Sequence, residues 1–133
     1  MAPMTFSYTG IRVRDMEESL AFYRDVLGMR VQFRMRLRTT GGEVALLRSP
    51  RGRQLLELNW YAPGSRFATR YAAGEGLDHL AFRVGDLRRT IAGLRKRRIK
   101  IVEGPIGSGR EAWAYIEDPN GIWIELVGSL GGP

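Results

Sequence analysis

The feature that most constrains how this chain can fold is an internal repeat. The stretch Phe6–Asp15 matches the stretch Gly76–Asp86, because each ends with Arg-Val followed one residue later by Asp. In this match Tyr8 takes the place of His79, the only histidine of the 133 residues. A chain with such self-similarity is expected to build one structural unit twice.

A second pair of stretches extends the repeat. Leu55–Leu58 matches Trp123–Leu126, and both stretches carry a glutamate at their third position. Four polar residues therefore hold equivalent places in the two halves of the chain, namely Tyr8, Glu57, His79 and Glu125.

Hydrophobic periodicity predicts one strand, one helix and three strands in the first half. Alternation in Phe6–Val13 indicates a strand, and Asp15 with Glu18 three residues later is typical of a helix start. Apolar residues then recur at helical spacing at Met16, Leu20, Tyr23 and Leu27. The later strands are expected at Met29–Thr40, Glu43–Arg48 and Gln54–Tyr61.

The second half repeats this order after a linker at residues 62–75. A strand is expected at Gly76–Val84, followed by a helix that Asp86 caps and that buries Leu87, Ile91 and Leu94. The remaining predicted segments are a strand at Ile99–Val102, a flexible loop at Gly104–Gly109, a hairpin of Glu111–Glu117 and Ile122–Val127 around the turn Asp118–Gly121, and a frayed tail at Gly128–Pro133.

The predicted fold class is therefore α+β, with two βαβββ modules at about residues 5–61 and 76–128 in a single domain spanning residues 1–133. We expect the modules to form a curled, concave mixed sheet. Because side chains alternate along a strand, Glu57 and Asn59 share one face, and His79 and Arg83 share the matching face of their own strand. These polar faces converge if the two sheets curl toward each other.

Composition narrows the classes of protein and partner. The absence of cysteine excludes disulfides and thiolate metal sites. No run of about 18 apolar residues and no signal-peptide pattern occurs, which predicts a soluble, cytoplasmic chain with no membrane partner. The net charge of +7 suggests nucleic acid, but the basic cluster Arg95–Arg98 falls on the polar last turn of a predicted helix. Since no nucleic-acid motif accompanies it, we expect a small-molecule substrate and no nucleic-acid partner.

The duplicated βαβββ order, the Arg-Val-x-Asp helix entry and the segment Asp118–Glu125 resemble the vicinal oxygen chelate (VOC) superfamily. This group includes glyoxalase I, bleomycin and fosfomycin resistance proteins, extradiol dioxygenases and methylmalonyl-CoA epimerase. The resemblance covers residues 6–127 and is closest in motif to glyoxalase I, the lactoylglutathione lyase.

The resemblance implies a metal site at the four equivalent places. The family's metal positions fall on Glu57, His79 and Glu125, while the position usually held by a histidine falls on Tyr8. One histidine with two carboxylates suits a divalent ion such as Zn, Ni, Co, Mn or Fe. The resemblance also implies substrate-binding roles for Arg12, Arg83 and Asn59.

Two questions stay open from the residues alone. Glu57 and Glu125 could instead pair with Arg12 and Arg83 in a metal-free polar network, since buried carboxylates need a partner. Tyr8 could bind the ion as a phenolate, hydrogen-bond to a water on the ion, or take no part.

The leading functional hypothesis is a metal-dependent lyase or isomerase of glyoxalase I type. The resemblance implies that Glu57 or Glu125 shuttles a proton through a metal-bound enediolate of a hemithioacetal, with Tyr8 as a further catalytic candidate. The alternative is a metal-free small-molecule binding or resistance protein of the same fold. An epimerase or a fosfomycin-type transferase comes third, and a single histidine argues against an extradiol dioxygenase. We also expect a homodimer, because long sheet edges need covering.

Overall fold

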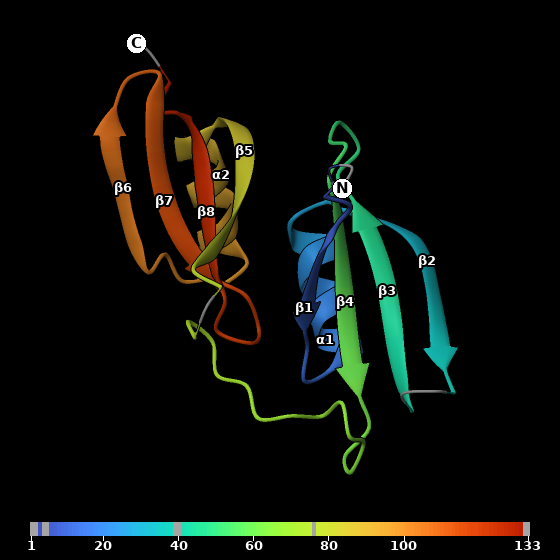
Figure 1. Cartoon of the computed structure of the whole chain (residues 1–133). Coiled ribbons are helices and arrows are strands. Elements are labelled where there is room, and N and C mark those ends of the chain that lie inside the picture. The colour runs from blue at the N-terminus through green and yellow to red at the C-terminus, as the bar shows by residue number, and fades with distance from the viewer. Residues whose placement is uncertain (1–2, 4–5, 39–40, 76, 132–133) are drawn as a thin grey trace. The chain divides into compact units, whose positions relative to one another are not determined.

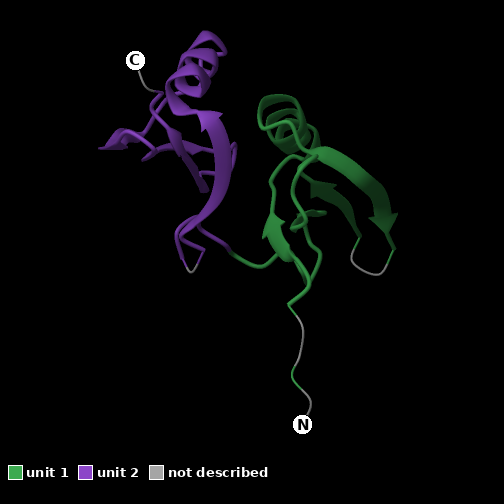
Figure 2. Cartoon of the chain, turned by 90° about the horizontal axis from the view of Figure 1, so that it is seen from above, with its two compact units in different colours: residues 1–70 green, residues 71–133 purple. Residues whose placement is uncertain are grey.

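The computed structural model describes residues 3, 6–38, 41–75 and 77–131 of the chain (Figure 1). The chain divides into two compact units, Met1–Arg70 and Tyr71–Pro133 (Figure 2). The boundary falls inside the predicted linker, where the described residues form turns but neither helix nor strand. Each unit has its own sheet and its own helix.

Unit 1 has the βαβββ order predicted for the first repeat. Its described strands form a mixed four-stranded sheet in the order β1-β4-β3-β2, with β1 parallel to β4 and the other neighbours antiparallel. The elements are β1 (Thr9–Arg12), α1 (Met16–Leu20), the π-helix η1 (Ala21–Val26), β2 (Arg30–Leu37), β3 (Gly42–Arg48) and β4 (Leu55–Tyr61) (Figure 1). The first strand is shorter than predicted, and Tyr8 precedes it. The predicted end of the second strand, Thr40, lies outside the described residues.

Unit 2 repeats the same order and the same strand arrangement. Its described strands form a mixed four-stranded sheet in the order β5-β8-β7-β6, with β5 parallel to β8. The elements are β5 (His79–Asp86), α2 (Leu87–Lys96), β6 (Glu103–Ser108), β7 (Glu111–Glu117) and β8 (Trp123–Ser129) (Figure 1). Gly76, where the first strand of this unit was expected to begin, lies outside the described residues.

Strand registers confirm the internal repeat at single-residue resolution. In unit 1, Gly10 on β1 lies opposite Glu57 on β4. In unit 2, Ala81 on β5 lies opposite Glu125 on β8. The two glutamates therefore hold equivalent places, and the predicted α+β class with two βαβββ modules is confirmed.

Both helices begin where the sequence predicts. The Asp15 side chain accepts a hydrogen bond from the backbone N–H of Glu18 at 2.9 Å. The Asp86 side chain accepts one from the backbone N–H of Arg89 at 3.0 Å. Each contact satisfies an N–H that has no partner within the helix, which fixes the point where the chain turns from strand to helix.

The first helix departs from the predicted apolar stripe near its end. Met16, Leu20 and Tyr23 are buried as expected, but Phe22 is buried at 7% exposure while Leu27 is only half-buried. The cause is the π-helix, in which the N–H of Leu27 donates to the carbonyl of Phe22 at 3.0 Å. This wider turn shifts the buried face by one residue, so a pattern based on 3.6 residues per turn fails there.

The predicted loop Gly104–Gly109 is wrong, and so is the predicted strand Ile99–Val102. The edge strand is β6, one step further along the chain, and it pairs with β7. A Cβ at Gly104 would lie 2.8 Å from the carbonyl oxygen of Trp113, and one at Gly107 would lie 2.8 Å from that of Glu111. Only glycine allows the two backbones to approach so closely. Gly104 and Gly107 are of a residue type typical of loops, but here they lie in a strand whose neighbour leaves no room for a side chain.

The last hairpin is confirmed, although its second strand runs further than expected. One Oδ1 atom of Asp118 accepts hydrogen bonds from the backbone N–H groups of Asn120 and Ile122, both at 2.8 Å, which holds the turn. The strand β8 continues to Ser129, and the N–H of Leu130 donates to the carbonyl of Gly109 at 2.8 Å. The predicted frayed tail is therefore paired over residues 128–130.

Candidate active site

One face of the unit 2 sheet is covered by α2, and the polar residues of interest lie on the other (Figure 1). Leu126 on β8 is 1% exposed and belongs to the core with the helix residues Leu87 and Ile91. Side chains alternate along a strand, so the residues that flank Leu126 and Ile124 point away from that core. We call four residues of this second face the open-face cluster: His79, Tyr115, Trp123 and Glu125.

The histidine and glutamate of the cluster are in contact. The Nε2 atom of His79 lies 2.9 Å from the Oε2 atom of Glu125, and the two side chains are 33% and 19% exposed. The parallel register places Ala81 opposite Glu125, and His79 lies on the same face two residues earlier. The structure therefore brings together the two predicted site residues of unit 2.

Two aromatic rings lie beside this pair. The Tyr115 ring meets the His79 ring edge to face at 5.9 Å and lies 5.2 Å from the Trp123 ring. Burial raises the pKa of the Tyr115 hydroxyl above its ordinary value, and the carboxylates of Glu125 and Asp78 raise that pKa further. The phenol therefore stays protonated, as a hydrogen-bond donor, well beyond neutral pH.

The contact between His79 and Glu125 fits two ligands of one metal ion. Two atoms that each lie about 2.1 Å from a divalent ion, at right angles, are about 3 Å apart, close to the separation seen here. Imidazole and carboxylate are both ligands of borderline divalent ions. Among the described residues, no group of three or more His, Asp or Glu side chains that could hold a metal comes together.

Glu57 and Asn59 lie on β4 in unit 1, on the face away from the buried residues Leu56 and Leu58. The Asn59 side chain donates to the backbone carbonyls of Ile11 at 3.4 Å and Glu57 at 3.5 Å. Asn59 thus ties β4 to β1. Sequence analysis gave it a substrate-binding role, which stays a prediction.

Tyr8 directly precedes β1, and Arg12 is the last residue of that strand. Tyr8 is 45% exposed and precedes the strand. The Arg12 guanidinium lies over the Tyr61 ring, 5.0 Å from its centre, and its Nη1 donates to the carbonyl oxygen of Thr69 at 2.5 Å. Arg12 therefore holds the first part of the linker against unit 1.

Arg12 and Arg83 contact groups other than Glu57 and Glu125, which would be their partners in the alternative, metal-free network. Arg83 approaches Glu111 at 3.9 Å, and both side chains are more than two-thirds exposed. In the part of the chain that the structure describes, no ion pair joins Arg12 to Glu57 or Arg83 to Glu125. The described contacts therefore give that network no support.

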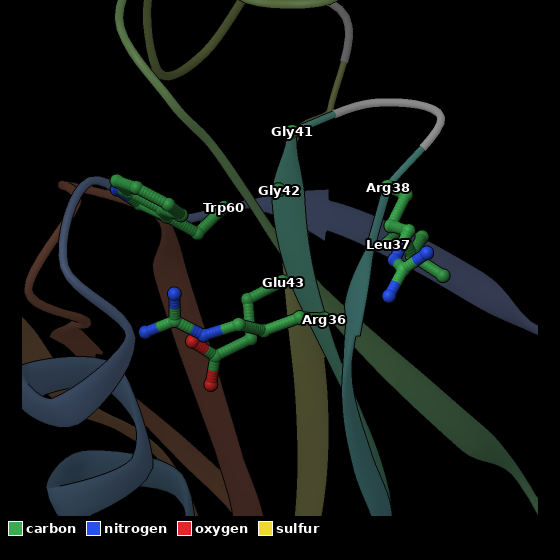
Figure 3. Close-up of a pocket in the computed structure, with 7 residues that line it drawn as sticks. All are labelled: Arg36, Leu37, Arg38, Gly41, Gly42, Glu43 and Trp60. Atoms are coloured by element: carbon green, nitrogen blue, oxygen red, sulfur yellow. The ribbon is translucent and has the colours of Figure 1, made fainter.

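A separate pocket of about 200 Å³ lies in unit 1 and contains none of the predicted site residues (Figure 3). Its lining includes Arg36, Glu43 and Trp60, which are cross-strand neighbours. Glu57 pairs with Leu46, which is three residues from Glu43 on a strand whose side chains alternate between the two faces. The three residues therefore lie on the face of the sheet opposite Glu57. The remaining lining residues are Leu37, Arg38, Gly41 and Gly42.

Sequence analysis missed one residue that touches the cluster. The Oδ2 atom of Asp78 lies 2.6 Å from the Nδ1 atom of His79. Its position directly before the only histidine was visible in the sequence. The repeat gave no signal for Asp78, because the corresponding residue in the first half, directly before Tyr8, is Ser7 and not an acid.

The fold consists of two copies of a βαβββ unit, and the second copy carries a histidine–glutamate pair on its open sheet face. The model of the Glyoxalase/Bleomycin resistance protein/Dioxygenase superfamily matches residues 5–126. The chain belongs to this superfamily.

Individual relatives agree with this assignment. A probable lactoylglutathione lyase of Synechocystis sp. is 33% identical over 132 residues, which are 93% of this chain and 95% of that protein. A lactoylglutathione lyase of Haemophilus influenzae is 30% identical over 135 residues, with coverage of 93% and 92%. Among solved structures, a trypanothione-dependent glyoxalase I of Leishmania major has a TM-score of 0.78 and 26% identity, covering 95% of this chain and 87% of that one.

No helix among the described residues is long and apolar enough to cross a membrane.

Proposed function

We propose that this protein is a glyoxalase I-type lyase that isomerises the hemithioacetal of a small 2-oxoaldehyde and a thiol. The proposal is supported by the superfamily match and by relatives named lactoylglutathione lyase that align over nearly the full length of both chains. The observation that carries it is the contact between His79 Nε2 and Glu125 Oε2 at 2.9 Å on the open sheet face.

We further propose that His79 and Glu125 hold one divalent metal ion. Glu57 and Tyr8, the counterparts of Glu125 and His79 in the repeat, are the remaining ligand candidates. A bound ion of this kind supplies Lewis acidity, which makes a C–H next to a carbonyl easier to deprotonate. The identity of the ion among Zn, Ni, Co, Mn and Fe is left to metal analysis.

The chain's own residues then move the proton and orient the substrate. In the isomerisation one carbon loses a proton and its neighbour gains one, so a single carboxylate can act as base and then as acid. Glu57 and Glu125 are the candidates. Tyr115, which lies opposite Glu125 on the neighbouring strand, contributes a protonated hydroxyl in unit 2. Arg12 and Arg83 are the candidate cationic groups for an anionic thiol.

The direct test mixes the purified, metal-supplemented protein with hemithioacetals of methylglyoxal and several thiols, and follows thioester formation by ultraviolet absorbance. The wild type is expected to be active with at least one thiol. Glu125→Gln and Glu57→Gln are each expected to lower kcat by about a hundredfold or more, as the loss of a general acid–base group does. Glu117→Gln is the matched control, because this exposed carboxylate lies on β7 of the same unit. Activity that survives both glutamate substitutions would rule out the proposed mechanism.

A second candidate is a small-molecule binding protein that performs no reaction. The observation that favours it is the aromatic surface formed by Tyr115 and by Trp123, which is 40% exposed. An antibiotic-binding protein of Streptomyces shares the fold at a TM-score of 0.71 and 20% identity, with coverage of 95% of this chain and 97% of that one. Quenching of tryptophan fluorescence by aromatic ligands, in a protein inactive with every thiol, would favour this candidate over the lyase.

A further inference from the structure

The imidazole of His79 is held from three sides. Asp78 Oδ2 lies 2.6 Å from Nδ1, Glu125 Oε2 lies 2.9 Å from Nε2, and the Tyr115 ring packs edge to face against the ring. Each ring nitrogen thus faces a carboxylate. Asp78 lies one residue before β5 begins, where the extended ladder does not force its side chain to the opposite face.

The chemistry of a neutral imidazole makes the two nitrogens unequal. A carboxylate only accepts hydrogen bonds, and a neutral imidazole has one N–H to donate. We assign that N–H to Nδ1, whose contact with Asp78 is the shorter of the two. The lone pair then lies on Nε2, where it faces an oxygen of Glu125 and leaves a position suited to a cation.

We propose that Asp78 is a positioning residue, which fixes the Nδ1–H form of His79 and so directs the Nε2 lone pair to the metal ion shared with Glu125. The inference rests on the proposed function, because it assumes that His79 is a metal ligand. Carboxylates that accept the second N–H of a ligating histidine commonly orient the ring and make the nitrogen a better ligand.

Asp78 is not assigned as a ligand itself, for two reasons. It contacts the nitrogen on the other side of the ring from Glu125. Its side chain is 94% exposed, whereas that of Glu125 is 19% exposed. This exposure also limits the expected effect, because water competes for both partners of the hydrogen bond.

The tautomer of His79 can be measured without metal, because the chain has one histidine and hence one set of imidazole signals. A neutral imidazole carries a proton on only one nitrogen, and ¹⁵N–¹H correlation spectra recorded at alkaline pH identify that nitrogen. The wild type is expected to show mainly Nδ1–H. Asp78→Ala is expected to lose this preference, and Asp78→Asn to keep part of it, since the amide oxygen still accepts.

The metal arm of the experiment measures zinc affinity by calorimetry. Asp78→Ala is expected to weaken zinc binding about tenfold, the lower end of the range for such orienting carboxylates. Asp78→Asn should fall between Asp78→Ala and the wild type. Glu75→Ala is the control, since it removes an exposed carboxylate from the same segment and is expected to change neither the tautomer nor the affinity.

The outcomes separate this inference from the function on which it rests. A wild type that binds zinc, with tautomer and affinity unchanged in Asp78→Ala, overturns the role of Asp78 and leaves the metal site in place. A wild type that binds no zinc overturns both. Complete loss of binding in Asp78→Ala, with binding kept in Glu125→Gln, would overturn the inference by making Asp78 a ligand.

Discussion

Gly10 and Glu57 face each other across the parallel strands β1 and β4, with 3.8 Å between a Cβ built on Gly10 and the Glu57 carboxylate. A Cβ at position 10 would make ordinary van der Waals contact with this carboxylate and a tighter contact, 3.3 Å, with Nδ2 of Asn59. The equivalent place in unit 2 is filled by Ala81, opposite Glu125. The repeat thus places a small residue opposite each glutamate.

The contact between Arg12 and Thr69 leads to a prediction about substrate charge. A guanidinium has five N–H donors, so Arg12 can bind an anionic thiol while it still contacts the linker. Arg12→Ala is expected to raise KM about tenfold or more for hemithioacetals of anionic thiols, since a hydrogen bond to a charged group contributes about 1.5–3 kcal/mol. Hemithioacetals of neutral thiols should show little change, as should the exposed control Arg53→Ala with both. An equal loss with both kinds of thiol would assign Arg12 to the linker alone.

Tyr115 provides a prediction about pH. Burial and the nearby carboxylates raise its pKa in the folded protein, so the unfolded chain releases this proton at lower pH. The contribution of Tyr115 to stability is therefore unchanged below the ordinary value of about 10 and decreases as the pH rises above it. Ultraviolet titrations of the wild type and of Tyr115→Phe are expected to differ by one phenol that titrates above the ordinary value. Titration curves that differ by a phenol of ordinary pKa would contradict this assignment.

The sequence predicts most of the fold because the repeat constrains every element twice. Capping by Asp15 and Asp86 needs only local contacts, and both helix starts are where the sequence placed them. The strand β6 was missed because Gly104 and Gly107 are typical of loops, and the backbone contact that requires glycine there depends on β7.

The candidate site was predictable in its residue types but less so in its contacts. The pairing of His79 with Glu125 follows from the register of β5 and β8, which the repeat anticipates. Asp78 was missed because alternation along a regular strand would place it on the other face from His79. The pairing of Arg12 with Glu57, which the sequence left open as an alternative, has no support among the described contacts, because the guanidinium lies over the Tyr61 ring and donates to Thr69.

In the repeat, Tyr8 holds the place in the first half that His79 holds in the second half. If Tyr8 occupies a ligand position, Tyr8→His is expected to tighten metal binding, because neutral imidazole binds without the cost of ionising a phenol with a pKa near about 10. Tyr8→Phe is the control, since it removes the hydroxyl and adds no ligand. Higher turnover in Tyr8→His would support a weakened ligand position, and lower turnover a catalytic role for the phenol. Unchanged affinity in Tyr8→His would exclude Tyr8 from the metal site.

The exposed edge strand β2 supports the prediction of a homodimer. Phe33 and Met35 on this strand are 46% and 50% exposed, and apolar side chains on an open sheet edge favour association. Light scattering at micromolar concentration is expected to give twice the chain mass of 15.0 kDa, and Phe33→Lys to lower it toward one chain. A wild-type mass of one chain would contradict the prediction.

The central claim is that this chain holds one divalent ion through His79. The most direct test is metal analysis after dialysis of the chelator-free protein against Zn, Ni, Co and Mn in turn, followed by dialysis against metal-free buffer. The wild type is expected to retain about one ion per chain of at least one metal, and His79→Ala to retain none, because removal of a ligating imidazole leaves only carboxylates. A wild type that retains no metal in any of these experiments would contradict the claim.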